Sequence, residues 1–259
     1  MVDGTEYMTK QYRVKERFWG GFGLARCPDF TGKTVLELGC GPGNRCIEAV
    51  DHGAKRVVGL DTSDADFSIG RRLLAEGPPQ WSECATFFHG TLDSLPPERF
   101  DVIISEDTFE HVMDLPDLLD QIRKRLKPRG QLFVGFGPLY HSPEGDHGWM
   151  RDVLPGRRLF PWPWGHLLLE HTAFRRLSII HGTKVQQTFN WPYLDLNQHT
   201  VDEFETIFRA SGLTVKYLKT NCVHSIKAKL FTSFAKIPPL RSYFTLNIFA
   251  ILESSSGDV

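Results

Sequence analysis

The feature that most constrains the fold is an apolar run that ends in three glycines on alternate positions. Residues 35–38 are apolar except for one acid, and Gly39, Gly41 and Gly43 follow them. Because glycine has no Cβ atom, such a turn can adopt unusual dihedral angles and bring its backbone close to a ligand. A helix that starts directly after the turn would point its N-terminus at the same place. The pattern therefore predicts a buried strand, a tight turn and a nucleotide-like ligand.

The spacing of the glycines separates two classes of ligand. A dinucleotide fingerprint G-x-G-x-x-G requires a glycine at position 44, where this chain has Asn44, and the G-x-x-x-x-G-K-[ST] loop is missing too. The form E-x-G-x-G-x-G, which begins at Glu37, resembles motif I of class I S-adenosylmethionine-dependent methyltransferases. This resemblance implies that Glu37, Cys40 and the glycines Gly39, Gly41 and Gly43 bind S-adenosyl-L-methionine. The alternative is a structural turn without a ligand.

An acid follows the next expected strand. Residues 57–60 are rich in β-branched residues, and Asp61 comes directly after them, 20 residues beyond Gly41. In an α/β sheet a carboxylate at the carboxyl end of this strand can accept hydrogen bonds from both ribose hydroxyls. We expect Asp61, with Thr62 beside it, to bind the cofactor. Alternatively, Asp61 caps the helix expected to begin near Ser63.

Hydrophobic patterning predicts an α/β fold with seven strands. Strands are expected at residues 35–38, 57–60, 85–89, 101–105, 131–136, 214–219 and 244–252, and helices at 44–52, 64–76, 115–126 and 201–210, the last capped by Thr200. The first five strands alternate with helices, which indicates a parallel sheet. The resemblance implies a Rossmann-like, mostly parallel sheet with helices on both faces, an antiparallel seventh strand and a cap insertion after strand 5.

The expected domain organisation has three parts. Residues 1–30 resemble the lid segment of small-molecule methyltransferases, although their aromatic residues could also form a packed accessory helix. Residues 31–253 form the methyltransferase domain with a cap insertion at 138–199, and the polar tail 254–259 is expected to be disordered. The aromatic residues of the first part are Tyr7, Tyr12, Phe18, Trp19 and Phe22.

Two further segments match the family. Residues 87–96 resemble the G-D-A-x-x-L-P segment that borders the adenine, with Thr91 at the usual position of the acid. The expected contacts are the backbone N–H near Leu92 and the side chain of Asp93, which could equally be an ordinary turn acid. Glu106, at the carboxyl end of the fourth strand, is expected beside the methionine part of the cofactor.

A cluster of polar residues follows Glu106. Asp107, Glu110 and His111 are spaced i, i+3, i+4 and would share one face of a helical turn. The segment resembles E-x-x-E-H of ubiquinone-biosynthesis O-methyltransferases. Three interpretations stay open: the three side chains hold a divalent metal ion, which is possible but not favoured; His111 is a general base; or they only brace the turn.

The cap insertion is the expected acceptor pocket. Four of the six tryptophans and six of the ten histidines lie between residues 137 and 199. His141 and His147 follow the fifth strand and are candidate bases, because a base must project from the roof of the crevice at the carboxyl ends of the strands. His166, Glu170 and His171 could suggest a metal site, but the leucines between them favour a buried helix.

Composition restricts the partners. The net charge is −1 and the sequence pI about 6.8, so no basic footprint indicates nucleic acid as a partner. The five cysteines form no C-x-x-C pair, which fits reduced thiols. Without a signal peptide or a run long enough to insert in a membrane, we expect a cytoplasmic protein. The segment 222–241 could complete the pocket or form a homodimer contact.

These observations favour methyl transfer to a small-molecule acceptor, with oxygen as the preferred atom. Nitrogen and carbon remain alternatives. A protein that binds S-adenosylmethionine without transferring its methyl group is a second hypothesis, and methylation of protein or RNA is a third. The last would predict a basic groove, which the near-neutral charge does not favour.

Overall fold

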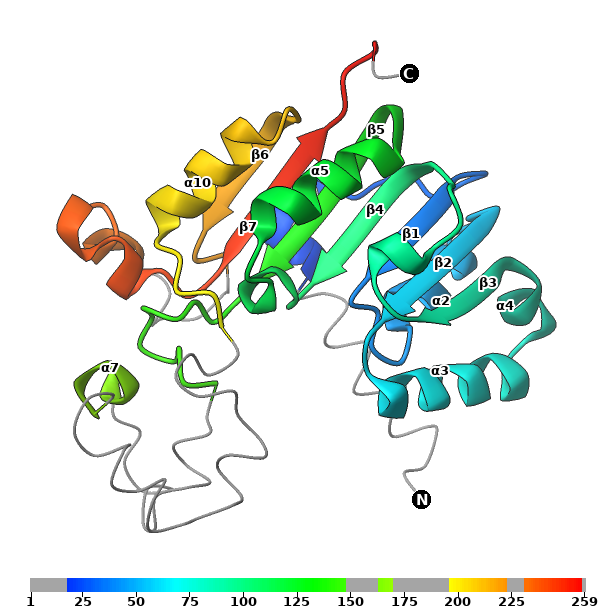
Figure 1. The fold of residues 1–259 in the computed structure, drawn as a ribbon, viewed down its shortest axis with the longest axis horizontal. Coiled ribbons are helices and arrows are strands. Elements are labelled where there is room, and N and C mark those ends of the chain that lie inside the picture. Colours follow the sequence, from blue (N-terminus) through cyan, green and yellow to red (C-terminus); the bar gives the residue numbers. More distant parts are fainter. Residues whose placement is uncertain (1–17, 148–162, 170–195, 223–230, 258–259) are drawn as a thin grey trace, which may run out of the picture.

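The computed structural model describes residues 18–147, 163–169, 196–222 and 231–257. These residues form a seven-stranded sheet in the order β3-β2-β1-β4-β5-β7-β6 (Figure 1). The strands are β1 (Thr34–Leu38), β2 (Arg56–Asp61), β3 (Ala85–His89), β4 (Phe100–Glu106), β5 (Leu126–Phe136), β6 (Thr214–Thr220) and β7 (Ile248–Glu253). Strand β7 runs antiparallel to both of its neighbours, β5 and β6, and the other strand pairs of this sheet are parallel. The expected α/β fold with an antiparallel seventh strand is confirmed.

Helices cover both faces of the sheet. The longer ones are α2 (Asn44–Asp51), α3 (Asp64–Glu76), α5 (Leu115–Arg125) and α10 (Val201–Ala210), and the shorter α4 (Pro79–Cys84) and α7 (Gly165–Leu169) accompany them. The 3₁₀ turns are η1 (Leu24–Arg26), η2 (Leu92–Ser94), η3 (Phe109–His111), η5 (Pro238–Leu240) and η6 (Ser242–Phe244). Helices α5 and α10 lie over one face (Figure 1) and bury Leu119 and Phe208 there. Helix α2 buries Cys46 and Ile47 in a second cluster.

Most element boundaries agree with the sequence prediction. Helix α10 begins with a capping box, in which Thr200 Oγ1 accepts the Glu203 N–H at 3.3 Å and the Glu203 carboxylate accepts the Thr200 N–H at 2.7 Å. Strand β7 begins at Ile248 and not at Phe244, because residues 242–244 form η6. The ring of Phe244 packs against Phe234, with centroids 4.9 Å apart, and takes no part in the sheet.

The residues before β1 complete the core. Residues 18–22 are helical, and Phe18, Trp19 and Phe22 are each at most 5% exposed. Their rings pack against Phe133 of β5 and Phe249 of β7. This packing fits the accessory helix, one of the two alternatives expected for the segment. The other two aromatic residues of the expected lid segment, Tyr7 and Tyr12, lie outside the described residues.

The first residue of the expected tail is bonded to β5. Ser254 is buried, its N–H donates to the Gly130 carbonyl at 3.0 Å, and its hydroxyl donates to the Lys127 carbonyl. These bonds hold Ser254 against β5, and the disorder expected for the rest of the tail stays a prediction.

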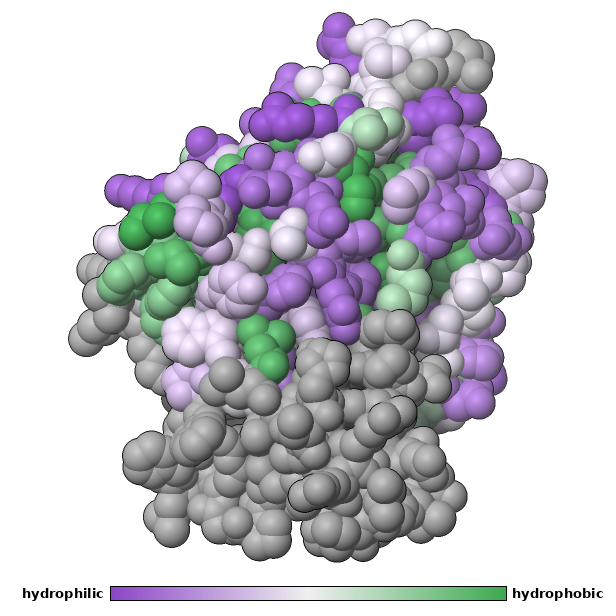
Figure 2. Space-filling model, turned by 60° about the vertical axis from the view of Figure 1, so that its left-hand side comes forward, coloured by the Kyte–Doolittle hydropathy of each residue, from purple (hydrophilic) through white to green (hydrophobic). Residues whose placement is uncertain are grey.

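One face of the described part carries many hydrophilic side chains. On the face shown in Figure 2, hydrophilic side chains cover most of the area that is not grey. Large hydrophobic residues that are exposed include Met113, Phe234, Ile237 and Tyr243. Of the helices in the described part, none has the length and hydropathy needed to cross a bilayer.

Candidate functional site

The glycine turn connects β1 to α2. A Cβ atom would have different surroundings at each of its three glycines. All three have a positive φ, of 71° at Gly39, 50° at Gly41 and 90° at Gly43. A Cβ atom on Gly39 would lie 2.1 Å from Thr108 Oγ1, and one on Gly43 would lie 2.1 Å from the Phe87 ring. A Cβ on Gly41 would meet no atom within 4 Å. The middle glycine therefore borders open space, whereas the outer two allow close packing within the protein.

Asp61 holds this turn from the end of β2. Its Oδ2 accepts the Gly41 N–H at 2.6 Å, and its Oδ1 accepts the Ser63 N–H at 2.8 Å. Helix α3 is capped by the Ser63 hydroxyl, which accepts the Asp66 N–H, so Asp61 is not the cap. Each carboxylate oxygen keeps a lone pair, and the side chain is half-buried at the carboxyl edge of the sheet. This position suits a group with two neighbouring hydroxyls.

Glu37 and Cys40 lie beneath the turn. Glu37 is 3% exposed, and its Oε2 accepts the Cys46 N–H of α2 at 2.8 Å. Desolvation by burial raises the pKa of Glu37 to about 8. Cys40 is buried too, and its N–H donates to the Leu60 carbonyl at 3.1 Å. Both residues therefore support the backbone of the turn from within the protein.

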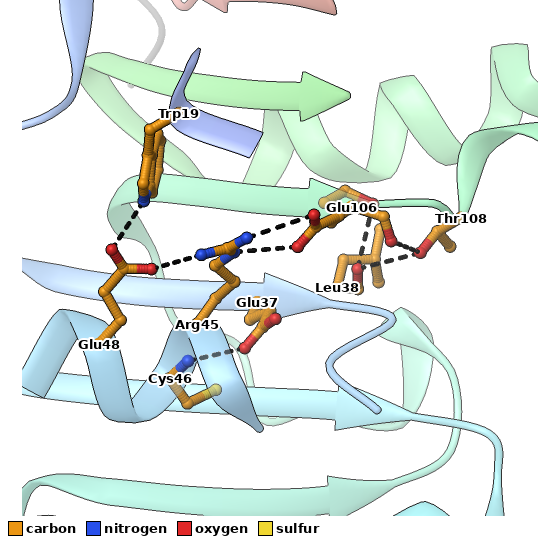
Figure 3. A network of polar contacts seen from close by, with 9 residues as sticks. Trp19, Glu37, Leu38, Arg45, Cys46, Glu48, Glu106 and Thr108 are labelled. Atoms are coloured by element: carbon orange, nitrogen blue, oxygen red, sulfur yellow. Dashed lines mark hydrogen bonds and ion pairs between the residues drawn. The ribbon is translucent and has the colours of Figure 1, made fainter. Parts of the chain in front are cut away.

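Glu106, at the end of β4, faces an arginine that sequence reasoning did not single out. Figure 3 shows Arg45 of α2 between two carboxylates. Arg45 Nε donates to Glu106 Oε2 at 2.9 Å, and Nη1 donates to Glu48 Oε2 at 2.7 Å. The indole N–H of Trp19 donates to the other oxygen of Glu48 at 2.9 Å. The sequence holds no motif that marks this buried network, because Arg45 and Glu106 lie 61 residues apart in the chain.

The expected adenine segment lies next to Asp61. The Gly90 N–H donates to the Asp61 carbonyl at 2.8 Å, which brings residues 90–92 to the end of β2. Leu92 is buried in η2, whereas Asp93 is exposed. Thr62 is exposed, and its carbonyl lies 3.0 Å from Nε2 of His89. The expected cofactor-binding residues thus lie near the carboxyl ends of β1, β2, β3 and β4.

The helical face expected for Asp107, Glu110 and His111 does not form. Asp107 has a φ of 47°, and the helical turn η3 starts only at Phe109. Asp107 is exposed, whereas Glu110 is 2% exposed, and its Oε1 accepts the Gly137 N–H at 3.1 Å. Within the described residues no group of three histidine, cysteine, aspartate or glutamate side chains has the geometry of a metal site. The premise of one shared face was wrong because the chain turns left-handed at Asp107.

The structure separates the three candidate bases. The rings of His111 and His147 lie together, with centroids 5.5 Å apart. His147 Nε2 lies 2.8 Å from the Pro138 carbonyl, and desolvation together with His111 lowers the pKa of His147. His141 contacts a different segment, and its Nε2 lies 2.9 Å from the Gln198 carbonyl. His111 and His147 therefore form a pair that does not include His141.

Asn197 ties the end of the cap insertion to η3. Its side-chain amide donates to the carbonyls of Phe109 at 2.6 Å and Val112 at 2.8 Å, and its backbone N–H donates to the Glu110 carbonyl at 2.7 Å. Because Glu110 also accepts the Gly137 N–H, the two ends of the insertion meet at η3. Sequence reasoning missed Asn197, since a single asparagine before a helix reads as an ordinary loop residue.

The remaining candidates of the insertion are partly described. His166 of α7 is buried, with its Nε2 2.6 Å from the Tyr140 carbonyl. Glu170 and His171 lie outside the described residues. Burial raises the pKa of Glu110 to about 7, and its Oε2 is a buried oxygen without a hydrogen-bond partner among the described residues. Glu110 of η3 thus adds a buried carboxyl group beside the point where the insertion begins, at Gly137.

Comparisons with known proteins agree with this geometry. A protein-family model described as a methyltransferase domain matches residues 13–218. The chain is 29% identical over 166 residues to the tRNA U34 carboxymethyltransferase of Idiomarina loihiensis, covering 60% of this chain and 50% of that protein. It is 32% identical over 105 residues to a ubiquinone biosynthesis O-methyltransferase of Mesorhizobium japonicum, covering 40% of this chain and 41% of that protein. The chain thus spans half, or less, of the length of these curated relatives.

A solved structure supports the fold. The crystal structure of an S-adenosylmethionine-dependent methyltransferase from Mesorhizobium loti has a TM-score of 0.56 and 22% sequence identity. The match covers 89% of this chain and 94% of that chain. At this level of identity the likeness concerns the arrangement of helices and strands alone.

Proposed function

Because the chain belongs to the class I S-adenosylmethionine-dependent methyltransferases, we propose that it transfers a methyl group to a small-molecule acceptor, preferably to an oxygen atom. The bound donor supplies an already activated methyl group. The protein has to hold the donor, align the acceptor and remove a proton from it. Each of these tasks can be assigned to residues at the carboxyl edge of the sheet.

The donor side of the proposal is supported by Gly41 and Asp61. Gly41 borders open space, and the Asp61 carboxylate next to it keeps a lone pair on each oxygen. These features fit a ribose diol and the close approach of a nucleoside. In the proposed site the cofactor lies along Gly39, Gly41 and Asp61, with residues 90–93 at the adenine and Glu106 at the methionine part.

The acceptor side rests on one observation, the pairing of His111 with His147. Desolvation and the neighbouring His111 lower the pKa of His147, so its imidazole is neutral and able to accept a proton at pH 7. His111 follows Thr108, whose hydroxyl donates to the Glu106 carbonyl at 2.9 Å beside the glycine turn. We assign the proton-accepting role to this pair, which favours an acceptor with an ionisable hydroxyl group.

The other interpretations differ in their products. Methylation of nitrogen or carbon in a small molecule would use the same donor site with a different acceptor. A regulatory protein would bind the donor and form no methylated product. The relatives include a protein that acts on tRNA and one of ubiquinone biosynthesis, but the net charge of −1 favours a small molecule for this chain.

The experiment combines binding with product analysis. Calorimetry should detect binding of S-adenosylhomocysteine, and the protein with labelled S-adenosylmethionine should then methylate members of a panel of phenols and other hydroxyl compounds, amines, peptides and tRNA. With a hydroxyl acceptor, His111→Ala or His147→Ala should lower turnover by about 10²–10⁴-fold and leave the cofactor affinity unchanged. His52→Ala, an exposed histidine of the loop after α2, is the matched control.

Three outcomes would change the assignment. Binding without any methylated product would favour the regulatory protein. Loss of turnover in His141→Ala but not in the other two variants would move the base to His141. A chelator that abolishes turnover would restore the metal interpretation of Asp107, Glu110 and His111.

A further inference from the structure

A continuous chain of polar contacts joins the segment before β1 to the end of β4. It runs from the Trp19 indole N–H to Glu48, on to Arg45 and then to Glu106, with donor–acceptor distances of 2.9, 2.7 and 2.9 Å (Figure 3). Arg45 is 3% exposed and Glu48 7%. Buried charges are costly unless they are paired, so this chain occupies a defined arrangement.

Arg45 is held from several directions. Its guanidinium carbon lies 4.9 Å from the ring centroid of Phe18 and 5.9 Å from that of Trp19. It also forms ion pairs with the carboxylates of Glu48 and Glu106. Arg45 is the second residue of α2, so its backbone is fixed by the glycine turn. The position of its planar donor group is therefore set by the fold before any ligand binds.

Glu106 is the member of the chain that reaches the site. Its two oxygens accept Arg45 Nε at 2.9 Å and Nη2 at 3.3 Å, and each oxygen keeps a lone pair. The side chain of Glu106 is 22% exposed, in contrast to its buried partner. Arg45 divides its single positive charge between two carboxylates, so Glu106 retains negative charge toward the solvent-exposed side.

The neighbouring acid does not compete with Glu106 for a cation. Burial raises the pKa of Glu37 to about 8, so Glu37 is mostly protonated at pH 7. The Glu106 carboxylate lies beside the end of the glycine turn, because it accepts a hydrogen bond from Arg45, the second residue of the helix that follows Gly43. A cationic group of a ligand in this turn would therefore meet the carboxylate of Glu106.

We infer that Arg45 is a positioning residue, which presents the Glu106 carboxylate to the ammonium group in the methionine part of the methyl donor. This inference rests on the proposed function. It assigns to Arg45 a role in recognising the amino-acid part of the ligand, through a residue that Arg45 orients, and no direct contact of Arg45 with the ligand is required.

The test compares two ligands that differ in this part. S-adenosylhomocysteine carries the amino-acid group, and 5′-methylthioadenosine lacks it. Calorimetry should show that Glu106→Gln and Arg45→Met lower the affinity for S-adenosylhomocysteine about tenfold or more and leave that for methylthioadenosine within about twofold. Arg45→Lys, which keeps the charge but not the planar fork, should fall in between.

A double variant separates positioning from a purely structural role. If Arg45 acts through Glu106, the variant with both Arg45→Lys and Glu106→Gln binds S-adenosylhomocysteine no more weakly than Glu106→Gln alone. Arg56→Met is the matched control, because Arg56 pairs with Glu98 at 2.9 Å at the start of β2, away from the carboxyl edge. Thermal unfolding identifies variants that do not fold. If Arg45→Met does not fold, the comparison is made with Arg45→Lys.

The outcomes distinguish the two proposals. The role of Arg45 would be overturned if the losses of affinity in the two single variants added up in the double variant. It would also be overturned if both ligands lost affinity equally, or if no variant changed the affinity. All three results would leave the proposed function intact. A wild-type protein that binds neither ligand would overturn the proposed function itself.

Discussion

At the scale of single residues, Asp61 holds the glycine turn and, in the proposed site, would bind the ribose of the cofactor. Asp61→Asn keeps an oxygen for the Gly41 N–H but removes the charge and the second oxygen, which accepts the Ser63 N–H. We expect the affinity for S-adenosylhomocysteine to fall about 10- to 100-fold, because a hydrogen bond to a charged group contributes about 1.5–3 kcal/mol. Calorimetry measures this loss. Asp64→Asn, a neighbouring acid with a side chain that is 90% exposed, should bind as the wild type does, and equal losses in both variants would contradict the assignment.

Glu37 gives a prediction for the pH dependence of stability. Its pKa is about 8 in the folded protein and ordinarily 4.5, so between these values the folded state holds a proton that the unfolded state has released. Stability therefore falls as the pH rises from about 4.5 to about 8 and levels off above that. At about 1.4 kcal/mol per pKa unit, the contribution of Glu37 amounts to roughly 3–5 kcal/mol.

The variant Glu37→Gln isolates this contribution. A glutamine oxygen can still accept the Cys46 N–H, but the side chain cannot ionise. Urea unfolding between pH 5 and pH 9 should show a smaller decline in the free energy of unfolding than in the wild type. Identical pH profiles would mean that Glu37 titrates normally in the folded protein.

The sequence could identify the residues that stand at a fixed distance from the end of a predicted strand. The three glycines and Asp61 stand at fixed distances from strand ends, and these distances follow from the connectivity of an α/β unit. No such spacing marks Arg45 and Asn197. Their partners, Glu106 and Phe109, are 61 and 88 residues away in the chain, and only the folded structure brings them together.

At the scale of elements, substitutions at two positions of the glycine turn should have opposite effects: one should weaken ligand binding, and the other should lower stability. A methyl group at Gly41 meets open space, so Gly41→Ala should cost only about 1–2 kcal/mol for its left-handed conformation. The same methyl group would enter the space proposed for the cofactor. We therefore expect a folded variant with at least about tenfold weaker binding of S-adenosylhomocysteine.

Gly43→Ala is the matched comparison, because its methyl group would lie 2.1 Å from the Phe87 ring. It should lose several degrees of melting temperature, as overpacking of a core does. Melting curves and calorimetry on both variants check the contrast. If Gly41→Ala binds as well as the wild type, the open space beside Gly41 is not the cofactor site.

The turn η3 shows why one expected element was wrong. The spacing of Asp107, Glu110 and His111 fits a helix, but three features of the folded chain oppose it. Asp107 is left-handed, the Asp107 N–H is bound to the Gly135 carbonyl of β5, and the Thr108 hydroxyl is bound near β1. These tertiary bonds outweigh the helical spacing of the three polar residues. The side chain of Asn197, at the end of the cap insertion, is bonded to η3.

At the scale of the whole molecule, the first and last parts of the described chain close the same core. Phe18 and Phe22 lie on β5 and β7, and the Tyr217 hydroxyl of β6 donates to the Gly21 carbonyl at 2.9 Å. The sheet order could be anticipated from the alternation of strands and helices. That residues 18–22 serve as a core helix could not, because a short aromatic cluster fits a lid as well as a buried face.

Phe22 allows these two roles to be distinguished. It is fully buried, with ring centroids 5.5 Å from Phe133 and 5.2 Å from Phe249. If residues 18–22 belong to the core, Phe22→Ala should lower the free energy of unfolding by about 3–5 kcal/mol, measured in urea. Well below its melting temperature, the folded variant should bind S-adenosylhomocysteine as the wild type does. Phe234→Ala, a substitution of a 40% exposed ring, should cost less than about 1 kcal/mol. A lid predicts the reverse pattern for Phe22→Ala, with weakened binding and nearly unchanged stability.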